Sequence, residues 1–217
     1  MKNKLFIISF ALNILTFLLV LIGTIIMMTI GSGALASNSL SVFKYFTFQS
    51  NIFVGMVSAI YAYYQFLVIQ KKIEKVPHAL AIFLHIGASA VALTFIIVIA
   101  FLAPGYGFDK MYNKANLFFH LLVPVVAIIN YVVFLKVESY RFIQTLFNLI
   151  PSISYGIVYF IVVASLNGYG NLEVDFYGFG KDGPLIGAFN FLVVVIIAYL
   201  IALLLYFGNR FVFKKSK

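Results

Sequence analysis

The chain has 217 residues, of which 64% are hydrophobic and only 10% are charged, and it contains no cysteine. A water-soluble domain of this length could not bury so much apolar surface in one core, so the composition excludes an ordinary soluble protein. The net charge of +9 does not indicate a nucleic-acid-binding protein, because the basic residues form short clusters between long uncharged stretches. The lack of cysteine excludes disulfides, and the spacing of the acids and histidines predicts no metal site.

Six apolar stretches are each long enough to cross a hydrocarbon layer, which takes about 20 helical residues. The first, residues 5–30, follows a basic start as a signal peptide would, but it exceeds the usual signal core of about 7–15 residues. We therefore interpret it as a retained helix. The other five are residues 43–69, 79–102, 115–135, 142–165 and 184–207. The sequence thus predicts an all-α polytopic membrane protein, with a single domain of six transmembrane helices.

The basic residues predict the orientation of these helices. In such a six-helix topology, eleven of the fifteen Lys and Arg residues fall on the side of the N-terminus. The four on the other side are Lys44, Lys110, Lys114 and Lys181. Since Lys and Arg are enriched in cytoplasmic loops, we expect both termini to be cytoplasmic, in a multi-pass protein of the cell membrane.

Most connections between the predicted helices are short, but residues 167–183 form a longer outer segment rich in Gly, Tyr and Phe. Such a segment could fold over the bundle as a lid or lie at the membrane surface as an aromatic loop. We favour the second interpretation from composition alone.

Two histidines, His85 and His120, lie inside the predicted helices. Ionisable residues in lipid are costly and often mark a functional site, although a single buried histidine is more often a packing residue. His120 lies about five residues below the outer end of the fourth helix. Thr47, near the outer end of the second helix, is expected at almost the same depth.

Polar residues form stripes on three of the predicted helices. Thr47, Ser50 and Asn51 share one face of the second helix, because they follow an i, i+3, i+4 spacing. Asn116 stands one turn above His120. The fifth helix carries Asn148, Ser152, Tyr155 and Tyr159 on one face. These stripes are consistent with a shared internal cavity, and equally with hydrogen bonds that hold helices together.

A hydroxyl and a histidine at one depth suggest nucleophilic chemistry. Threonine is a weak nucleophile unless a base removes its proton, and neutral histidine suits that role. No acid lies within the helices to orient His120, so Thr47 and His120 would form a dyad. The predicted substrate-binding or oxyanion-stabilising residues are Gln49, Ser50, Asn51, Asn116, Tyr155 and Tyr159. An acyl lipid would enter from the outer leaflet, and no cofactor is expected.

The segments Lys44–Asn51, Phe119–Pro124, Asn130–Phe134 and Pro151–Tyr155 together resemble the androgen-induced-protein family of membrane threonine hydrolases, in particular its bacterial six-helix branch. The resemblance implies a hydrolase of fatty-acid esters of hydroxy fatty acids, with Thr47 as nucleophile and His120 as its partner. A related group resembles acyltransferases that move fatty chains between lipids. The chain departs from the family at Asn130, where bacterial relatives often carry an acid.

Our leading hypothesis is therefore a membrane-embedded lipid ester hydrolase or acyltransferase that uses Thr47 and His120. The alternative is a non-catalytic lipid-binding or carrier protein whose polar stripes line a binding cavity. Transporters usually show signs such as intramembrane acids, broken helices or internal repeats, and the lack of these signs in the sequence weakens this alternative without excluding it. A purely structural bundle would have no cavity between the second, fourth and fifth helices.

Overall fold

The computed structural model describes residues 2–31, 40–137 and 140–214. These residues form helices joined by turns and loops, with no strand among them. Six helical segments are long and apolar enough to cross a membrane, which confirms the predicted fold class. They are Lys4–Thr29, Phe46–Ile69, His78–Tyr106, Ala115–Phe134, Phe142–Ser165 and Pro184–Phe213.

Three of the six segments are uninterrupted and three are composite. The uninterrupted helices are α1 (Lys2–Thr29), α2 (Phe46–Ile69), which follows the short 3-10 helix η1 (Leu40–Lys44), and α9 (Pro184–Lys214). The third segment joins α3 (His78–Ile97), the π-helical η2 (Val98–Leu102) and α4 (Ala103–Tyr106); α5 (Phe108–Met111) follows it. The fourth joins α6 (Ala115–Leu117), η3 (Phe118–Leu122), α7 (Val123–Ile129) and η4 (Asn130–Phe134), and the fifth joins the 3-10 helix η5 (Phe142–Leu149) to α8 (Ile150–Ser165).

Proline accounts for most of these changes in helix type. Pro104 and Pro124 each stand two residues beyond a π-helical segment, and Pro151 lies at the start of α8, directly after η5. Proline has no N–H, so it cannot continue the regular α-helical hydrogen bonds. The third π-helical segment, η4, has no such proline. Its end is held instead by Asn209, whose side-chain amide donates to the carbonyl oxygens of Tyr131 (2.6 Å) and Leu135 (2.7 Å).

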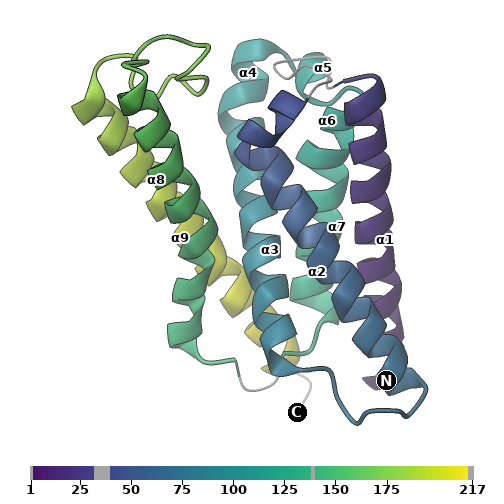
Figure 1. Ribbon diagram of the computed structural model, residues 1–217. Helices are drawn as coiled ribbons and strands as arrows, with labels where there is room; N and C mark the ends of the chain where they lie inside the picture. The colour runs from purple at the N-terminus through teal and green to yellow at the C-terminus, as the bar shows by residue number, and fades with distance from the viewer. Residues whose placement is uncertain (1, 32–39, 138–139, 215–217) are drawn as a thin grey trace.

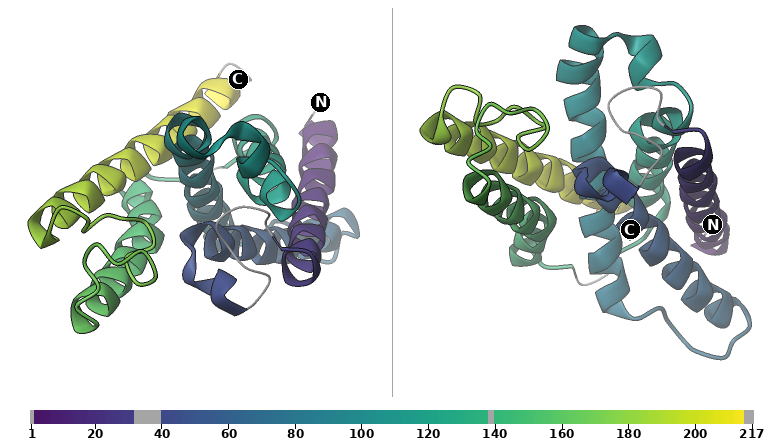
Figure 2. Two further views of the ribbon diagram at one scale, coloured as in Figure 1. Left: turned by 90° about the horizontal axis from the view of Figure 1, so that it is seen from above. Right: turned by 45° about the horizontal axis from the view of Figure 1, so that its top comes forward.

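The helices form a main group and a side pair. Figure 1 shows α1, α2, α3 and α7 close together, with α8 and α9 beside them. The pair diverges from the main group toward one end and approaches α3 at the other, and both views of Figure 2 keep α8 and α9 together on one side. Both termini lie at the end where α9 meets α3, which we call the terminal end. The opposite end, with residues 107–114 and 166–183, is called the loop end.

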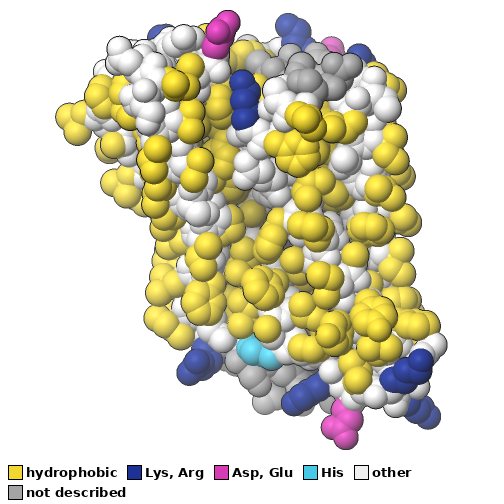
Figure 3. Space-filling view, in the orientation of Figure 1, with side chains coloured by type: hydrophobic (Ala, Val, Ile, Leu, Met, Phe, Trp, Pro, Cys, Tyr) yellow, Lys and Arg dark blue, Asp and Glu magenta, His cyan; other side chains and the backbone are white. Residues whose placement is uncertain are grey.

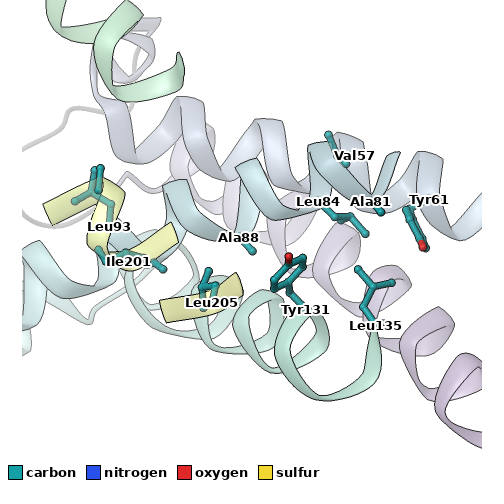
Figure 4. Close-up of a cluster of buried hydrophobic side chains, with 12 residues drawn as sticks. Val57, Tyr61, Ala81, Leu84, Ala88, Leu93, Tyr131, Leu135, Ile201 and Leu205 are labelled. Atoms are coloured by element: carbon teal, nitrogen blue, oxygen red, sulfur yellow. The ribbon is translucent and has the colours of Figure 1, made fainter. Parts of the chain in front are cut away.

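The largest apolar core lies where α2, α3, η4 and α9 meet (Figure 4). Leu84, Ala88 and Leu93 of α3 face Tyr131 of η4 and Ile201 of α9 there. The third segment is accordingly the most enclosed of the six: 61% of its most apolar 18-residue stretch is buried, compared with 22% for the first and sixth segments.

Small residues allow the helices of the main group to approach closely. A Cβ atom added to Gly55 of α2 would lie 2.9 Å from Val20 of α1, and one added to Gly87 of α3 would lie 2.9 Å from Val54 of α2. Lipid tails are as apolar as the helix surfaces, so the hydrophobic effect does not drive helices together within a bilayer. Close backbone packing of this kind is therefore a main source of helix association there.

The outer surface is apolar along most of its length. Figure 3 shows hydrophobic side chains across the middle of one face, with charged side chains at the rims. The exposed hydrophobic residues include Ile25, Ile157 and Leu204, which would be costly to leave in water. Together with the six long apolar segments, this surface is that of a multi-pass membrane protein.

Candidate active site

Three hollows lie near the loop end, and they share residues. The histidine cavity, about 90 Å³, is lined by Thr47, Asn116 and His120 with aromatic side chains around them. The threonine cleft, about 360 Å³, is lined by Thr47, Tyr155, Tyr159 and residues of η2 and α9. The lysine cleft, about 490 Å³, is lined by Lys44, Phe46 and residues of α8. Thr47 therefore lies where the histidine cavity and the threonine cleft meet.

Thr47 lies in the first turn of α2 and is the exception among the six threonines of the chain. In a helix a threonine hydroxyl usually donates to a carbonyl three or four residues earlier. The hydroxyls of Thr16, Thr24, Thr29, Thr94 and Thr145 all do so. Among the described residues, by contrast, only the backbone carbonyl of Thr47 takes part in hydrogen bonds, with Ser50 and Asn51. Its hydroxyl remains available in the cavity wall.

His120 is held in η3 by a single hydrogen bond to the backbone. Its Nδ1 lies 2.7 Å from the carbonyl oxygen of Met111 in α5. A carbonyl can only accept, so Nδ1 carries the proton, and in the neutral ring Nε2 has a free lone pair. No described residue forms a hydrogen bond with Nε2. The Met111 carbonyl thus fixes the tautomer that a general base requires, a role for which the sequence offered no acid.

Two contacts bring the start of α2 against η3. The side-chain amide of Asn51 donates to the carbonyl of Phe119 (3.1 Å) as well as to that of Thr47 (2.7 Å). The rings of Phe48 and Phe119 meet edge to face, with centroids 5.5 Å apart. These contacts give Thr47 and His120 a common cavity. The structure records no hydrogen bond between their two side chains within its described ranges.

The other predicted site residues divide between the hollows. Asn116 lines the histidine cavity, and its amide donates to the carbonyl of Lys110 (3.2 Å). Gln49 and Ser50 line the lysine cleft instead. Gln49 donates to the Phe43 carbonyl (2.7 Å), and Asn51 serves to join α2 to η3, as described above.

Tyr155 and Tyr159 of α8 line both clefts but not the histidine cavity. The hydroxyl of Tyr155 donates to the carbonyl of Lys44 at 2.5 Å. The hydroxyl of Tyr159 donates to the carboxylate of Asp175, which is fully buried. Tyr159 therefore lines a hollow together with Thr47, as its depth in the sequence predicts, but it does not line the cavity that contains His120.

Sequence reasoning missed the contribution of the segment between α8 and α9. Its Phe176 and Tyr177 line the histidine cavity. The backbone N–H of Phe46, at the start of α2, donates to the hydroxyl of Tyr177 (3.0 Å). The buried Asp175 carboxylate accepts from the backbone N–H of Gly180 (2.9 Å) and from Tyr159. This segment covers the cavities, and the available signal was its aromatic composition together with its three acids, Glu173, Asp175 and Asp182.

Tyr45 and Tyr177 add hydroxyl groups to the wall of the histidine cavity. Burial raises the pKa of Tyr45 above its ordinary value and that of Tyr177 to about 12. Both phenols therefore stay protonated at neutral pH. Within the described ranges, no group of three or more His, Cys, Asp or Glu side chains could hold a metal ion.

His85 has a different environment near the terminal end. Its Nε2 lies 3.1 Å from the carbonyl oxygen of Ala202, so Nε2 carries the proton. Its Nδ1 accepts hydrogen bonds from the hydroxyl of Tyr140 (2.7 Å) and the amide of Asn148 (3.1 Å). Its ring also stacks on that of Tyr131, with centroids 4.5 Å apart. Both ring nitrogens are used, and the bonds connect α3 to α9 and η5.

Asn130 is the position where the chain departs from the family that it resembles. It belongs to a second network of buried hydrogen bonds. Its amide donates to Asn13 Oδ1 (2.8 Å), and the amide of Asn13 donates to Gln65 Oε1 (2.8 Å). The network joins η4, α1 and α2. It lies apart from the residues that line the histidine cavity.

Comparisons with protein-family models, curated proteins and solved structures give no match. The interpretation of the site therefore depends on its own geometry. The decisive features are an unbonded threonine hydroxyl, a histidine with a defined tautomer, and a cavity that both residues line.

Proposed function

We propose that the protein is a membrane-embedded lipid ester hydrolase or acyltransferase with Thr47 as nucleophile and His120 as general base. The observation that carries the proposal is that Thr47, alone among the six threonines, has no hydrogen bond from its hydroxyl to any backbone group of the described residues, and that it shares a cavity with His120. The resemblance of Lys44–Asn51 and Phe119–Pro124 to membrane threonine hydrolases selects the same two residues. It suggests fatty-acid esters of hydroxy fatty acids as substrates.

In the proposed reaction, Nε2 of His120 removes the proton of the Thr47 hydroxyl as the oxygen attacks the ester carbonyl. The tetrahedral intermediate collapses to acyl-Thr47, and His120 returns the proton to the departing alcohol. Water then attacks the acyl-Thr47 ester in a hydrolase, and a lipid hydroxyl does so in an acyltransferase. In either case His120 accepts the proton of the attacking group and returns it to Thr47.

Asn116 is the best-placed side chain to stabilise the oxyanion among those predicted for that role. It lines the histidine cavity and uses one recorded hydrogen bond, to Lys110, so one amide hydrogen remains. The backbone N–H of Thr47 itself, in the first turn of α2, has no acceptor among the described residues and adds a second donor. Asn51 and Tyr159 have already given their hydrogens to other acceptors.

The threonine cleft supports an apolar substrate. It extends from Thr47 to Phe101 and Val193, whose side chains are 61% and 39% exposed on the lipid-facing surface. An acyl chain could therefore reach Thr47 sideways from the bilayer. The volume of about 360 Å³ is within the range of small-molecule sites.

The distribution of Lys and Arg supports an orientation of the protein in the membrane. The concentration of Lys and Arg on the side of the termini favours cytoplasmic ends in the cell membrane, with Thr47 in the outer half. The chain lacks cysteine, so the variants Lys75→Cys and Lys110→Cys each carry a single thiol. Labelling of each variant from outside intact cells shows which of the two positions faces outward. Labelling at position 75 and not at 110 would reverse the proposed orientation.

The test of catalysis uses the purified full chain in detergent with a long-chain ester. We expect Thr47→Val, which keeps the shape of the side chain, to lower turnover by at least about 10³-fold. Thr24→Val is the matched control, because Thr24 bonds to the Val20 carbonyl and lines none of the three hollows. An acyl group found on Thr47 by peptide mass spectrometry would identify the intermediate. Equal turnover by wild type and Thr47→Val would remove Thr47 as nucleophile.

A lipid-binding or carrier function is the second candidate. It is favoured by the missing hydrogen bond between Thr47 and His120, although such bonds are often formed only in the substrate complex. Under this alternative, an ester bound in the threonine cleft would remain intact during long incubation with the wild-type protein. Its binding would be unaffected by Thr47→Val.

A further inference from the structure

The lysine cleft is the largest of the three hollows, at about 490 Å³, and the proposed chemistry does not use it. It lies between the first half of α2 and α8, with apolar walls that include Phe53, Val158 and Val162. Val158 and Val162 are 61% and 45% exposed on the surface that faces lipid. A hydrocarbon chain could enter this cleft from the bilayer without passing through water.

Lys44 places a positive charge at the rim of the cleft. It directly precedes Tyr45 and the apolar helix α2, so it lies where hydrocarbon gives way to lipid head groups. Its ammonium group is 4.6 Å from the ring centroid of Phe176 and 5.4 Å from that of Tyr45. Within the described ranges, no carboxylate lies within salt-bridge distance of it. The three ammonium hydrogens therefore have no anionic partner in the part of the chain that the structure describes.

The cleft is separated from the reactive residues. The ring of Phe46 meets that of Tyr155 edge to face at 5.3 Å, and the hydroxyl of Tyr155 donates to the carbonyl of Lys44. Thr47 and His120 belong to the walls of the other two hollows. These contacts both fix the position of Lys44 and divide the lysine cleft from the threonine cleft.

We propose that the lysine cleft is a binding site for an anionic phospholipid of the loop-end leaflet, with one acyl chain in the cleft and its phosphate on Lys44. An apolar cleft open to the bilayer fits the chain, and an unpaired ammonium at head-group level fits the phosphate. The phosphate of a bilayer lipid lies at this level by default, whereas a free fatty acid would have to be present in addition. The site does not depend on the proposed hydrolase function.

The test is native mass spectrometry of the full chain in detergent, with equal amounts of phosphatidylglycerol and phosphatidylcholine. We expect the wild type to retain phosphatidylglycerol in preference, and Lys44→Gln to lower that preference about fivefold, the effect of one lysine near a lipid surface. Lys110→Gln is the matched control, because Lys110 lies at the same end in α5 and lines none of the hollows. Its lipid preference should equal that of the wild type.

A second variant tests the acyl-chain part of the site. Val158→Trp fills the cleft from its exposed rim and should cause loss of both bound lipids while the melting temperature stays unchanged. Full lipid retention by Val158→Trp, or the same lipid preference in wild type and Lys44→Gln, would overturn the site. Retention of added oleate in place of phosphatidylglycerol would overturn the phospholipid assignment and indicate a fatty carboxylate.

Discussion

The two buried histidines of the main helix group show how one residue type serves two purposes. His85, near the terminal end, uses both ring nitrogens in hydrogen bonds and stacks on Tyr131. His120, near the loop end, bonds to the described residues through Nδ1 alone, on the carbonyl of Met111, and lines a cavity of about 90 Å³. Both are almost fully buried in apolar helices. What distinguishes them is the number of polar atoms left without a partner.

The polar residues around the two histidines differ in what their side chains bond to. Near His85, the side chains of Tyr140 and Asn148 bond to the histidine itself and so join helices. Near His120, the hydroxyl of Thr47 has no recorded partner in the described ranges. Polar groups that bond to each other stabilise the bundle, whereas an unbonded group in a cavity costs stability and is retained where a ligand or substrate can use it.

The largest effect that separates the two regions is expected from His120→Asn. The asparagine amide can keep the bond to the Met111 carbonyl but supplies no base at the position of Nε2. We expect ester turnover to fall about 10²–10⁴-fold, the usual contribution of a general base, with little change in melting temperature. Turnover and thermal unfolding are measured on the same detergent sample. A large loss of stability with normal turnover per folded molecule would make His120 a second structural histidine.

His85→Ala should show the opposite pattern. The change removes a buried ring together with its hydrogen bonds to the Tyr140 hydroxyl, the Asn148 amide and the Ala202 carbonyl. The Tyr140 hydroxyl and the Asn148 amide keep their bonds to the carbonyls of Gln144 and Thr145. We expect the free energy of unfolding in detergent to fall by about 3 kcal/mol, with turnover per folded molecule unchanged. His78→Ala is the control, because His78 is exposed at the start of α3, and its effect should stay within about 0.5 kcal/mol. Normal stability of His85→Ala together with lost turnover would make His85 a reactive histidine and not a structural one.

The fold was predictable because hydrophobic length alone reports membrane-spanning helices. The predicted stretch 115–135 and the observed segment Ala115–Phe134 differ by a single residue. The interruptions were also readable in principle, since Pro104, Pro124 and Pro151 each mark a change of helix type. The 3-10 geometry of η5 was not, and it separates Asn148 from the α-helical face of Tyr155 and Tyr159.

The site was only partly predictable. The depths of Thr47 and His120 could be estimated from residue counting, and the two residues do line one cavity. The role of Met111 could not, because a backbone carbonyl leaves no mark in the sequence. For residues 167–183 composition favoured an interfacial loop over a lid, but composition does not show contacts such as that of Tyr177 with Phe46, by which the segment covers the cavities. Helical faces indicate which polar residues are neighbours, but not which of their atoms are already bonded.

The smallest effect we predict tests, within one helix, whether hydrogen bonding decides what a buried polar side chain contributes to stability. Asn13 of α1 is buried and bonds to both Gln65 and Asn130. Ser9, one turn earlier on α1, is equally buried, but its hydroxyl has no partner among the described residues. Because hydrogen bonds between membrane helices contribute about 0.6 kcal/mol each, Asn13→Ala should lower the free energy of unfolding by about 1 kcal/mol.

Ser9→Ala should leave stability unchanged or raise it slightly, because it removes a polar group that folding strips of its partners. Both variants are compared by denaturant titration in the same detergent, and neither should alter turnover, since Ser9 and Asn13 line none of the three hollows. Equal destabilisation by the two variants would mean that burial alone, and not bonding, decides what a polar side chain contributes. The contrast between His85 and His120 would then no longer separate structural from reactive groups.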